Sequence, residues 1–296
     1  MFDLIKAAIP FFIALVLIEA IAYHFDDHED QPGYDARDTA TSLTMGVGNV
    51  VMNLGWKLVM IAVLAAVYSV VPFHMPMDQP WPWALLIVAE DLCFYASHRS
   101  GHEIRLLWAS HVVHHSSQHY NLSTALRQEW FHMYTVVFWV PLAIVGFPPY
   151  AIVLAQAISL VYQFWIHTEK IRKLPRPVEF LFNTPSHHRV HHGANTGYLD
   201  RNYGGILIIW DRMFGTFREE NERVVYGLTK NVESFNPIRV VTHEWAMIIS
   251  DLKSAPDFRT KLGYLFRKPG WEPNSEPEET AAEEIQAESP EVKTPV

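Results

Sequence analysis

The chain has 296 residues, of which 49% are hydrophobic, and its formal net charge at pH 7 is −9. An acidic chain without a basic face is not expected to bind nucleic acid, and no P-loop or GxGxxG sequence supports a bound nucleotide. The single cysteine, Cys93, excludes a disulfide within the chain and a cysteine-ligated zinc or iron–sulfur cluster.

Apolar segments dominate the first 170 residues. Five of them stand out: 4–23, 54–71, 84–97, 131–146 and 150–165. The first two are long enough to cross the hydrocarbon core of a bilayer, which takes about 17–25 apolar residues. The last two are shorter, and Pro148 and Pro149 between them indicate a helical hairpin. The middle segment carries Glu90 and Asp91, so it could be a shorter span or an interfacial helix.

This pattern predicts an all-α protein, a polytopic membrane bundle of four or five spans, rather than a soluble core. Basic residues lie close to the histidine-rich segments described below: Arg99, Arg105, Arg127, Lys170, Arg172, Lys173, Arg176 and Arg189. Because basic residues are enriched in cytoplasmic loops, we expect an integral membrane protein whose histidines lie in a helical cap on the cytoplasmic face.

A single domain is expected to cover residues 1–270, with the motifs that carry chemistry between 91 and 217. From Glu272 onward the chain holds eight Glu and almost no large apolar residue. Such a segment cannot bury enough surface to offset the entropy of ordering. Residues 271–296 are therefore predicted to be a disordered acidic tail without a chemical role.

Histidine provides the strongest signal in the sequence. Nine of the sixteen histidines form three tight groups, and a tenth stands alone before the last group: His98, His102; His111, His114, His115; His167; His187, His188, His191, His192. Histidines three or four residues apart share one face of a helix, so each group directs several ring nitrogens the same way. Chance clustering on a surface would give pairs rather than three such groups. Ten nitrogens are roughly twice what one tetrahedral zinc ion uses, so the pattern predicts two metal ions.

Ligation by nitrogen alone leaves the metal open among zinc, copper, iron and nickel. Zinc would favour hydrolysis by a metal-bound hydroxide, whereas iron would favour activation of dioxygen. A site at the cytoplasmic mouth of a membrane bundle meets lipid chains from the bilayer and reductant from the cytosol, which favours oxidation of a lipid. The alternative from another class is a histidine-rich haem-binding or metal-transport protein without oxygenase activity, although dense histidine sets outside the apolar segments are not typical of it.

Several strings of residues resemble a known family. They are DLCFYASHRSGH (91–102), WASHVVHHSS (108–117), ALRQ (125–128), FWIHTE (164–169) and NTPSHHRVHHG (183–193). Together, from about Tyr34 to about Trp245, they resemble the fatty acid hydroxylase/sterol desaturase superfamily of integral-membrane di-iron oxygenases. Within it, the chain is most similar to members that hydroxylate the ether-bearing carbon of alkylglycerols with tetrahydrobiopterin.

The resemblance implies two iron ions, dioxygen as co-substrate and a membrane lipid as substrate. It assigns eight histidines as iron ligands, with His167 and His187 as the remaining two: His98, His102, His111, His114, His115, His188, His191 and His192. Glu103 matches a family glutamate that is tied to the use of a pterin, although a surface acid would look the same. Asp91 lies two helical turns before His98, so it could orient a ligand imidazole, or it could be a buried acid paired with an arginine.

The electron donor and the lipid stay open at this point. Electrons would come from tetrahydrobiopterin or from another external reductant, such as a separate redox protein, because no cytochrome-b5-type haem domain is visible in the sequence. Members of the superfamily also hydroxylate or desaturate sterols, carotenoids and fatty acyl chains, so these lipids are the alternatives to an alkylglycerol.

Overall fold

The computed structural model describes residues 4–25, 33–131 and 133–273, where the secondary structure is helical apart from two isolated β-bridges. In chain order the elements are α1 (Leu4–His24), α2 (Ala36–Val70), α3 (Pro80–Glu103), α4 (Arg105–His115), η1 (Thr124–Leu126), η2 (Met133–Thr135), α5 (Val136–Ile144), α6 (Pro149–Trp165), α7 (Arg176–Leu181), α8 (Pro185–His191), α9 (Ile209–Phe214), α10 (Pro237–Ser254) and α11 (Phe258–Phe266). The predicted all-α class is confirmed. Most of the predicted acidic tail, residues 274–296, lies outside the described residues.

Two helices, α1 and α2, are long and apolar enough to cross a membrane. Apolar side chains point outward along both of them; for example, Phe11, Val50 and Leu54 are 65–70% exposed. A helix satisfies its own backbone hydrogen bonds, so it can present such a surface to lipid without cost to its polar groups. These two helices support the predicted membrane location.

The other apolar segments form shorter or more polar helices. The expected hairpin is present as α5 and α6, which are 9 and 17 residues long. The segment 84–97 forms the middle of α3, which carries His98 and His102 in its last turns. Within the described residues, α1 and α2 are the helices that reach the length and hydropathy of a full span.

Helix α2 begins eighteen residues earlier than the apolar segment 54–71 predicts, at Ala36. The side chain of Asp35 accepts hydrogen bonds from the backbone N–H groups of Arg37 and Asp38, which caps the helix. The first turns of α2 are polar, and Thr41 and Ser42 are buried. The N-terminal part of this helix therefore belongs to the protein interior, and its apolar surface begins further along the chain.

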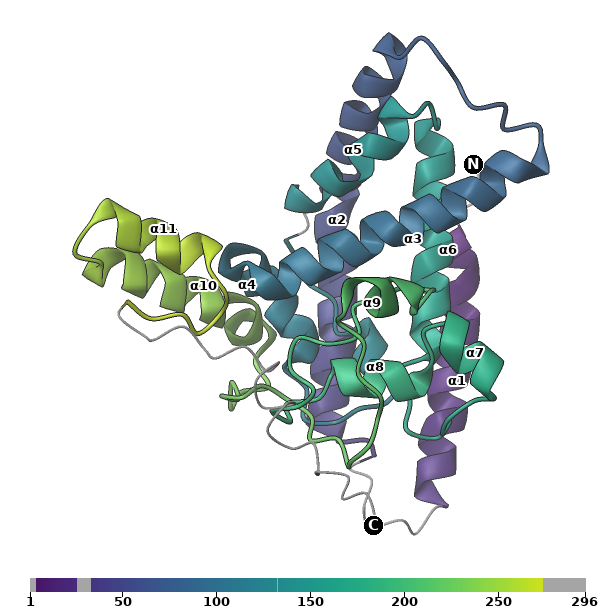
Figure 1. Cartoon of the computed structure of the whole chain (residues 1–296). Coiled ribbons are helices and arrows are strands. Elements are labelled where there is room, and N and C mark those ends of the chain that lie inside the picture. Colours follow the sequence, from purple (N-terminus) through teal and green to yellow (C-terminus); the bar gives the residue numbers. More distant parts are fainter. Residues whose placement is uncertain (1–3, 26–32, 132, 274–296) are drawn as a thin grey trace, which may run out of the picture.

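Figure 1 shows how the helices bring the histidine-bearing segments together. Helix α3 crosses the bundle and leads at Ile104 into α4 (Figure 1). Helices α8 and α9 lie below α3 in this view, among the loops of the cap. A hairpin of α10 and α11 extends sideways from α4 (Figure 1). The apolar core of the bundle is formed by α2, α3, α5 and α6, and it includes Leu64, Leu86, Leu142 and Ile152.

A buried ion pair joins α2 to the cap. Arg127 is 2% exposed, and its Nη1 donates to Oδ1 of Asp38 at 3.0 Å. The Nε of Arg127 donates to the Oγ of Ser116 at 3.0 Å, and Asp38 accepts a second hydrogen bond of 2.6 Å from Ser117. Each buried charge therefore has an opposite charge and a hydroxyl as partners, which offsets its loss of hydration.

Replacing Arg127 with Met is expected to destabilise the protein by about 3–5 kcal/mol, because Asp38 would remain as an unpaired buried charge. The double variant Arg127→Met/Asp38→Leu should recover part of this loss, since it removes both charges. Denaturant unfolding in detergent measures the free energy of unfolding of the three proteins. Equal or greater destabilisation of the double variant would contradict the ion pair as the cause.

Candidate metal centre

The structure gathers nine of the ten candidate histidines into two sets. Group one comprises His98, His102, His111, His115 and His191, and group two comprises His114, His167, His188 and His192. Within each group, one potential ligand atom from every residue lies within 4.8 Å of the others. The rings of His115 and His192 stack with their centroids 4.4 Å apart, so the two groups adjoin.

Two helices, α4 and α8, each contribute rings to both groups. In each adjacent pair, His114-His115 on α4 and His191-His192 at the end of α8, the two rings enter different groups. Neighbouring residues of an α-helix point about 100° apart, so one short helix can serve two sites that lie on either side of it. Each of these two helices therefore contributes a ring to both groups, which adjoin.

The backbone holds the outer nitrogen of several rings. Four Nδ1 atoms lie 2.8–3.1 Å from carbonyl oxygens: His98 from Tyr203, His114 from Arg127, His167 from Gln163 and His191 from Arg201. A carbonyl only accepts hydrogen bonds, so each of these rings carries its proton on Nδ1. The Nε2 of the neutral ring is then free to bind a metal, and the backbone fixes the direction in which it points.

The inner nitrogens converge in a way that hydrogen bonding alone does not explain. The Nε2 atoms of His114 and His167 lie 3.1 Å apart, although both rings carry their proton on Nδ1. Two lone pairs that face each other at this distance repel unless a cation lies between them. The Nε2 atoms of His102 and His191 are buried without a hydrogen-bond partner. These nitrogens fit metal ions, with five candidate ligands in one group and four in the other.

Burial keeps these imidazoles neutral. It lowers the pKa of His114 to about 4. Burial, and then repulsion from neighbouring imidazoles, lowers the pKa of His188 and His192 well below the ordinary range. Since the neutral imidazole is the form that binds metal, little competition from protons is expected near neutral pH.

His187 belongs to neither group, although it directly precedes His188. Its Nε2 lies 3.0 Å from Oε2 of Glu179 on α7, and its ring packs against Phe217. Burial alone would raise the pKa of Glu179, but hydrogen bonds from His187, from Ser186 and from a backbone N–H group lower it to about 2. The structure therefore places His187 as a link between α7 and α8, on the opposite side from the converging nitrogens.

Asp91 is buried and anchors a loop next to group one. Its carboxylate accepts hydrogen bonds of 2.6–3.0 Å from the backbone N–H groups of Ile206 and Leu207 in this loop and from the indole of Trp210 on α9. The same loop contains Tyr203, whose carbonyl accepts from His98. These hydrogen bonds connect Asp91 to His98 through the loop rather than by contact with an imidazole, and none of them comes from an arginine.

Glu103 follows His102 at the end of α3 and remains accessible. Its side chain is 33% exposed, and its Oε1 accepts a hydrogen bond of 2.9 Å from the Nε of Arg99. On the other side of His102, the Oδ1 of Asp200 lies 3.7 Å from Nδ1 of the ring. The oxygen Oδ2 of Asp200 lies 3.5 Å from the Nζ of Lys268. The carboxylate of Asp200 therefore borders group one, and Glu103 follows one of its rings in the sequence.

The segment around Arg201 orients two ligands, and the histidine spacing did not reveal it. Asp200 and Asn202 both have φ of 56°, in the left-handed region that Asn and Asp tolerate better than most residues. This backbone conformation allows the carbonyls of Arg201 and Tyr203 to reach His191 and His98. An Asp-x-Asn sequence in a loop is the only local signal that could have indicated it.

Comparison with known proteins places the site within a family. Residues 83–216 match the family model described as fatty acid hydroxylase. Human alkylglycerol monooxygenase is 42% identical over 273 residues, which cover 92% of this chain and 60% of the human protein. The alkylglycerol monooxygenase of Caenorhabditis elegans is 35% identical over 83% of this chain and 50% of its own length. The ornithine lipid hydroxylase OlsE of Rhizobium tropici is 28% identical over 69% of this chain and 63% of its own length.

The chain thus spans about 60% of the length of the human relative. All nine histidines of the two groups lie within the matched residues 83–216. No solved structure matches the chain.

The purified protein is expected to contain about two metal ions per chain, one for each group of nitrogens. His191→Ala and His192→Ala should each lower the metal content, because each removes a candidate ligand from one group. His187→Ala is the matched control from the same helix and should retain the metal, since its ring points toward Glu179. Elemental analysis, with circular dichroism to check folding, measures this. Equal loss in all three folded variants would contradict the two-group arrangement.

Proposed function

Because the chain belongs to the fatty acid hydroxylase family, we propose that it is an integral-membrane, oxygen-dependent lipid monooxygenase that holds two iron ions. The observation that carries this proposal is the pair of adjoining all-histidine groups. Nine converging nitrogens suit two metal ions, whereas haem takes one or two axial ligands. Iron is proposed rather than zinc because the relatives are named as monooxygenases and hydroxylases.

When bound, two iron ions would supply the activation of dioxygen that oxidation of an unactivated C–H bond requires. The residues of the chain orient the candidate ligands of these ions. Backbone carbonyls hold the rings of His98, His114 and His191 so that their Nε2 atoms point inward. The buried surroundings exclude water from group two, whose four histidines are all buried. A dry site protects reactive species from side reactions with solvent.

We propose that the chain crosses the membrane four or five times and that the histidine groups lie at the cytoplasmic face. α3, α5 and α6 would add shorter spans to α1 and α2. Exposed basic residues support this orientation, because Arg172, Lys173 and Arg176 lie between α6 and the first turn of α7. Such residues are enriched on the cytoplasmic side of membrane proteins.

An ether-bearing glycerolipid is the substrate that we propose. The support is the 42% identity to human alkylglycerol monooxygenase over most of this chain. Hydroxylation of the ether-bearing carbon would give a hemiacetal, which breaks down to an aldehyde and a glycerol. The chain is also similar, more distantly, to a hydroxylase that acts on a different lipid, an ornithine lipid. The alternative substrates are therefore other lipids: sterols, carotenoids and fatty acyl chains. A long lipid chain would enter from the bilayer, between the apolar helices.

For the electron donor we propose tetrahydrobiopterin, with a separate redox protein as the alternative. Glu103 supports a pterin because its carboxylate is accessible and the residue directly follows His102 in the sequence. A pterin presents amino and ring N–H groups, and a carboxylate is a strong acceptor for them. The neighbouring Arg99 keeps the carboxylate in place through a hydrogen bond of 2.9 Å.

The reconstituted, iron-loaded protein is expected to release a fatty aldehyde from an alkylglycerol when tetrahydrobiopterin and oxygen are both present. His114→Ala should abolish the release, because it removes a nitrogen from group two. Aldehyde detection by mass spectrometry measures this, with lipidomics of host cells that carry or lack the gene as a second test. Turnover without oxygen would indicate a hydrolase. Altered sterols, carotenoids or hydroxylated acyl chains with unchanged ether lipids would exclude the alkylglycerol.

Glu103→Gln is expected to raise the KM for tetrahydrobiopterin about 10- to 100-fold, the effect of losing a hydrogen bond to a charged group. The metal content should stay unchanged, because Glu103 belongs to neither histidine group. Asp78→Asn, which removes an acid far from the site in sequence, is the control and should leave the KM unchanged. A Glu103→Gln protein with unchanged KM would favour a redox protein as the donor.

A further inference from the structure

Helix α11 presents an unusual surface at the end of the α10–α11 hairpin, which we name the arm (residues 237–271). Phe258, Leu262 and Phe266 are spaced by four residues and therefore form a stripe along one face of α11. They are 73%, 40% and 56% exposed. Three large apolar side chains in one exposed stripe are costly in water and mark a surface that another apolar phase covers.

Basic residues border this stripe, without acids among them. The segment 258–271 contains four basic residues and no Asp or Glu: Arg259, Lys261, Arg267 and Lys268. Arg259 and Lys261 lie on opposite sides of the stripe, because they follow Phe258 by about 100° and 300° around the helix. An apolar stripe flanked by cations is typical of helices that lie in a membrane interface.

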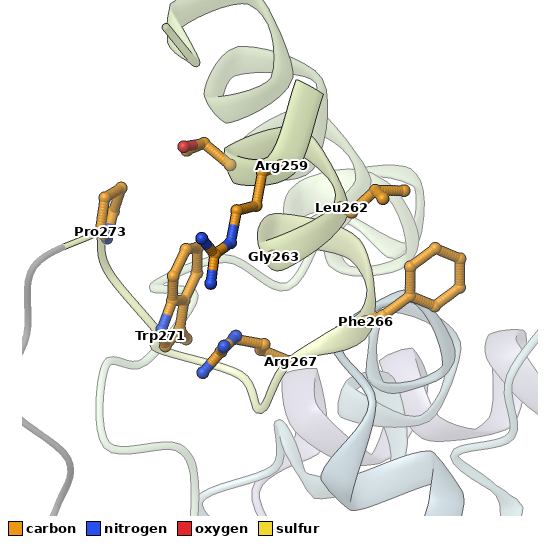
Figure 2. A pocket seen from close by; sticks show the side chains of 8 residues that line it. Arg259, Leu262, Gly263, Phe266, Arg267, Trp271 and Pro273 are labelled. Carbon is orange, nitrogen blue, oxygen red and sulfur yellow. The ribbon is translucent and has the colours of Figure 1, made fainter. Parts of the chain in front are cut away.

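An open pocket beside the stripe gathers two of these cations around an indole. Figure 2 shows Arg259, Arg267 and Trp271 on one side of α11, and Leu262 and Phe266 pointing to the other. Trp271 lies directly against the backbone of the helix, because a Cβ at Gly263 would be 2.4 Å from its ring. The guanidinium of Arg267 lies 5.2 Å from the centre of the same ring. None of the residues that line the pocket is acidic.

The root of the arm is fixed to a membrane helix. Val240 and Val241 of α10 pack in one buried cluster with Met45 of α2. Exposed apolar side chains of α2 lie on both sides of this contact, with Leu43 44%, Val47 67% and Val50 65% exposed. The arm therefore leaves the protein beside exposed apolar side chains of α2, and it extends sideways from the bundle (Figure 1).

Further contacts hold the arm to α4. Arg105 of α4 donates to Glu244 and Asp251 of α10, at 2.8 and 2.6 Å. Its backbone N–H also donates to the carbonyl of Arg267 at 3.0 Å. These contacts fix the face of α11 that meets the protein, so the stripe and its cations are directed away from the protein in a defined orientation.

From these observations we infer that the arm rests on the surface of the membrane and binds anionic phospholipids. The apolar stripe enters the outer edge of the hydrocarbon, and Trp271 lies at the level of the headgroups, where indoles are enriched. Arg259 and Arg267 bind the phosphate of a lipid in the pocket, as charge-assisted donors. The arm thereby sets the height of the cap above the bilayer.

The test uses the full chain in nanodiscs of phosphatidylcholine, with or without phosphatidylglycerol, and follows hydrogen exchange of residues 258–271. Phosphatidylglycerol should slow this exchange in the native protein. Each basic residue near an anionic membrane contributes roughly fivefold to binding, so Arg259→Gln/Arg267→Gln should lose most of the response. Arg172→Gln/Lys230→Gln removes two exposed cations outside the arm and should respond as the native protein does.

Two results would overturn the inference. One is exchange at residues 258–271 that does not depend on phosphatidylglycerol in the native protein. The other is protection that is present in phosphatidylcholine alone and disappears when residues 274–296 are deleted, because the acidic tail would then be the occupant of this surface. Neither readout depends on enzymatic activity or on metal, so the result is independent of the proposed function.

Discussion

Nine imidazole rings are packed with their inner nitrogens facing one another, and the rest of the cap depends on this constraint. Each ring has to remain neutral. The N–H at its outer nitrogen needs a hydrogen-bond acceptor, so that the lone pair on the inner nitrogen stays directed at the candidate metal site. Backbone carbonyls meet this need for four of the rings, but a carbonyl inside a helix is usually already used by that helix. The carbonyls of Arg127, Arg201 and Tyr203 are free because they lie in irregular segments. The loops of the cap are therefore as necessary to the site as the helices that carry the histidines.

The histidine spacing predicted that the rings would lie close together, but not which rings would belong to group one and which to group two. The period of the helix indicates that His188, His191 and His192 share a face. The same rule also places His187 near His191, four residues later, yet in the structure the ring of His187 turns to Glu179. The resemblance to a family suggested His187 as a ligand, whereas in the structure its Nε2 lies 3.0 Å from the carboxylate of Glu179. The assignment of five rings to one group and four to the other required tertiary structure, because α4 and α8 contribute to both.

The membrane part was harder to predict for a physical reason. Apolar composition indicates burial in lipid or in protein, and it does not distinguish the two. The segment 131–146 is as apolar as a span, but part of it forms the short α5, whose Trp139 and Leu142 pack in the core. Helix α2 shows the opposite case, because its first turns are polar, bury Thr41 and Ser42, and lie outside the apolar segment that predicted the helix. Asp91 illustrates a third limit: its partners are backbone groups more than a hundred residues away in sequence, which no local pattern indicates.

The ion pair between Asp38 and Arg127 joins a residue outside the family match to a residue inside it. The boundaries of the family match, 83–216, enclose every ring of both groups but leave out Asp38 on α2. They also leave out Glu19 on α1, whose carboxylate accepts from the backbone of Leu122 at 2.7 Å and from Thr168, the residue after His167. A fragment cut at these boundaries would keep all the candidate ligands and lose the charges that hold the ligand-bearing loops. The matched region 83–216 is therefore a unit of sequence similarity, while the unit of folding includes the first two helices.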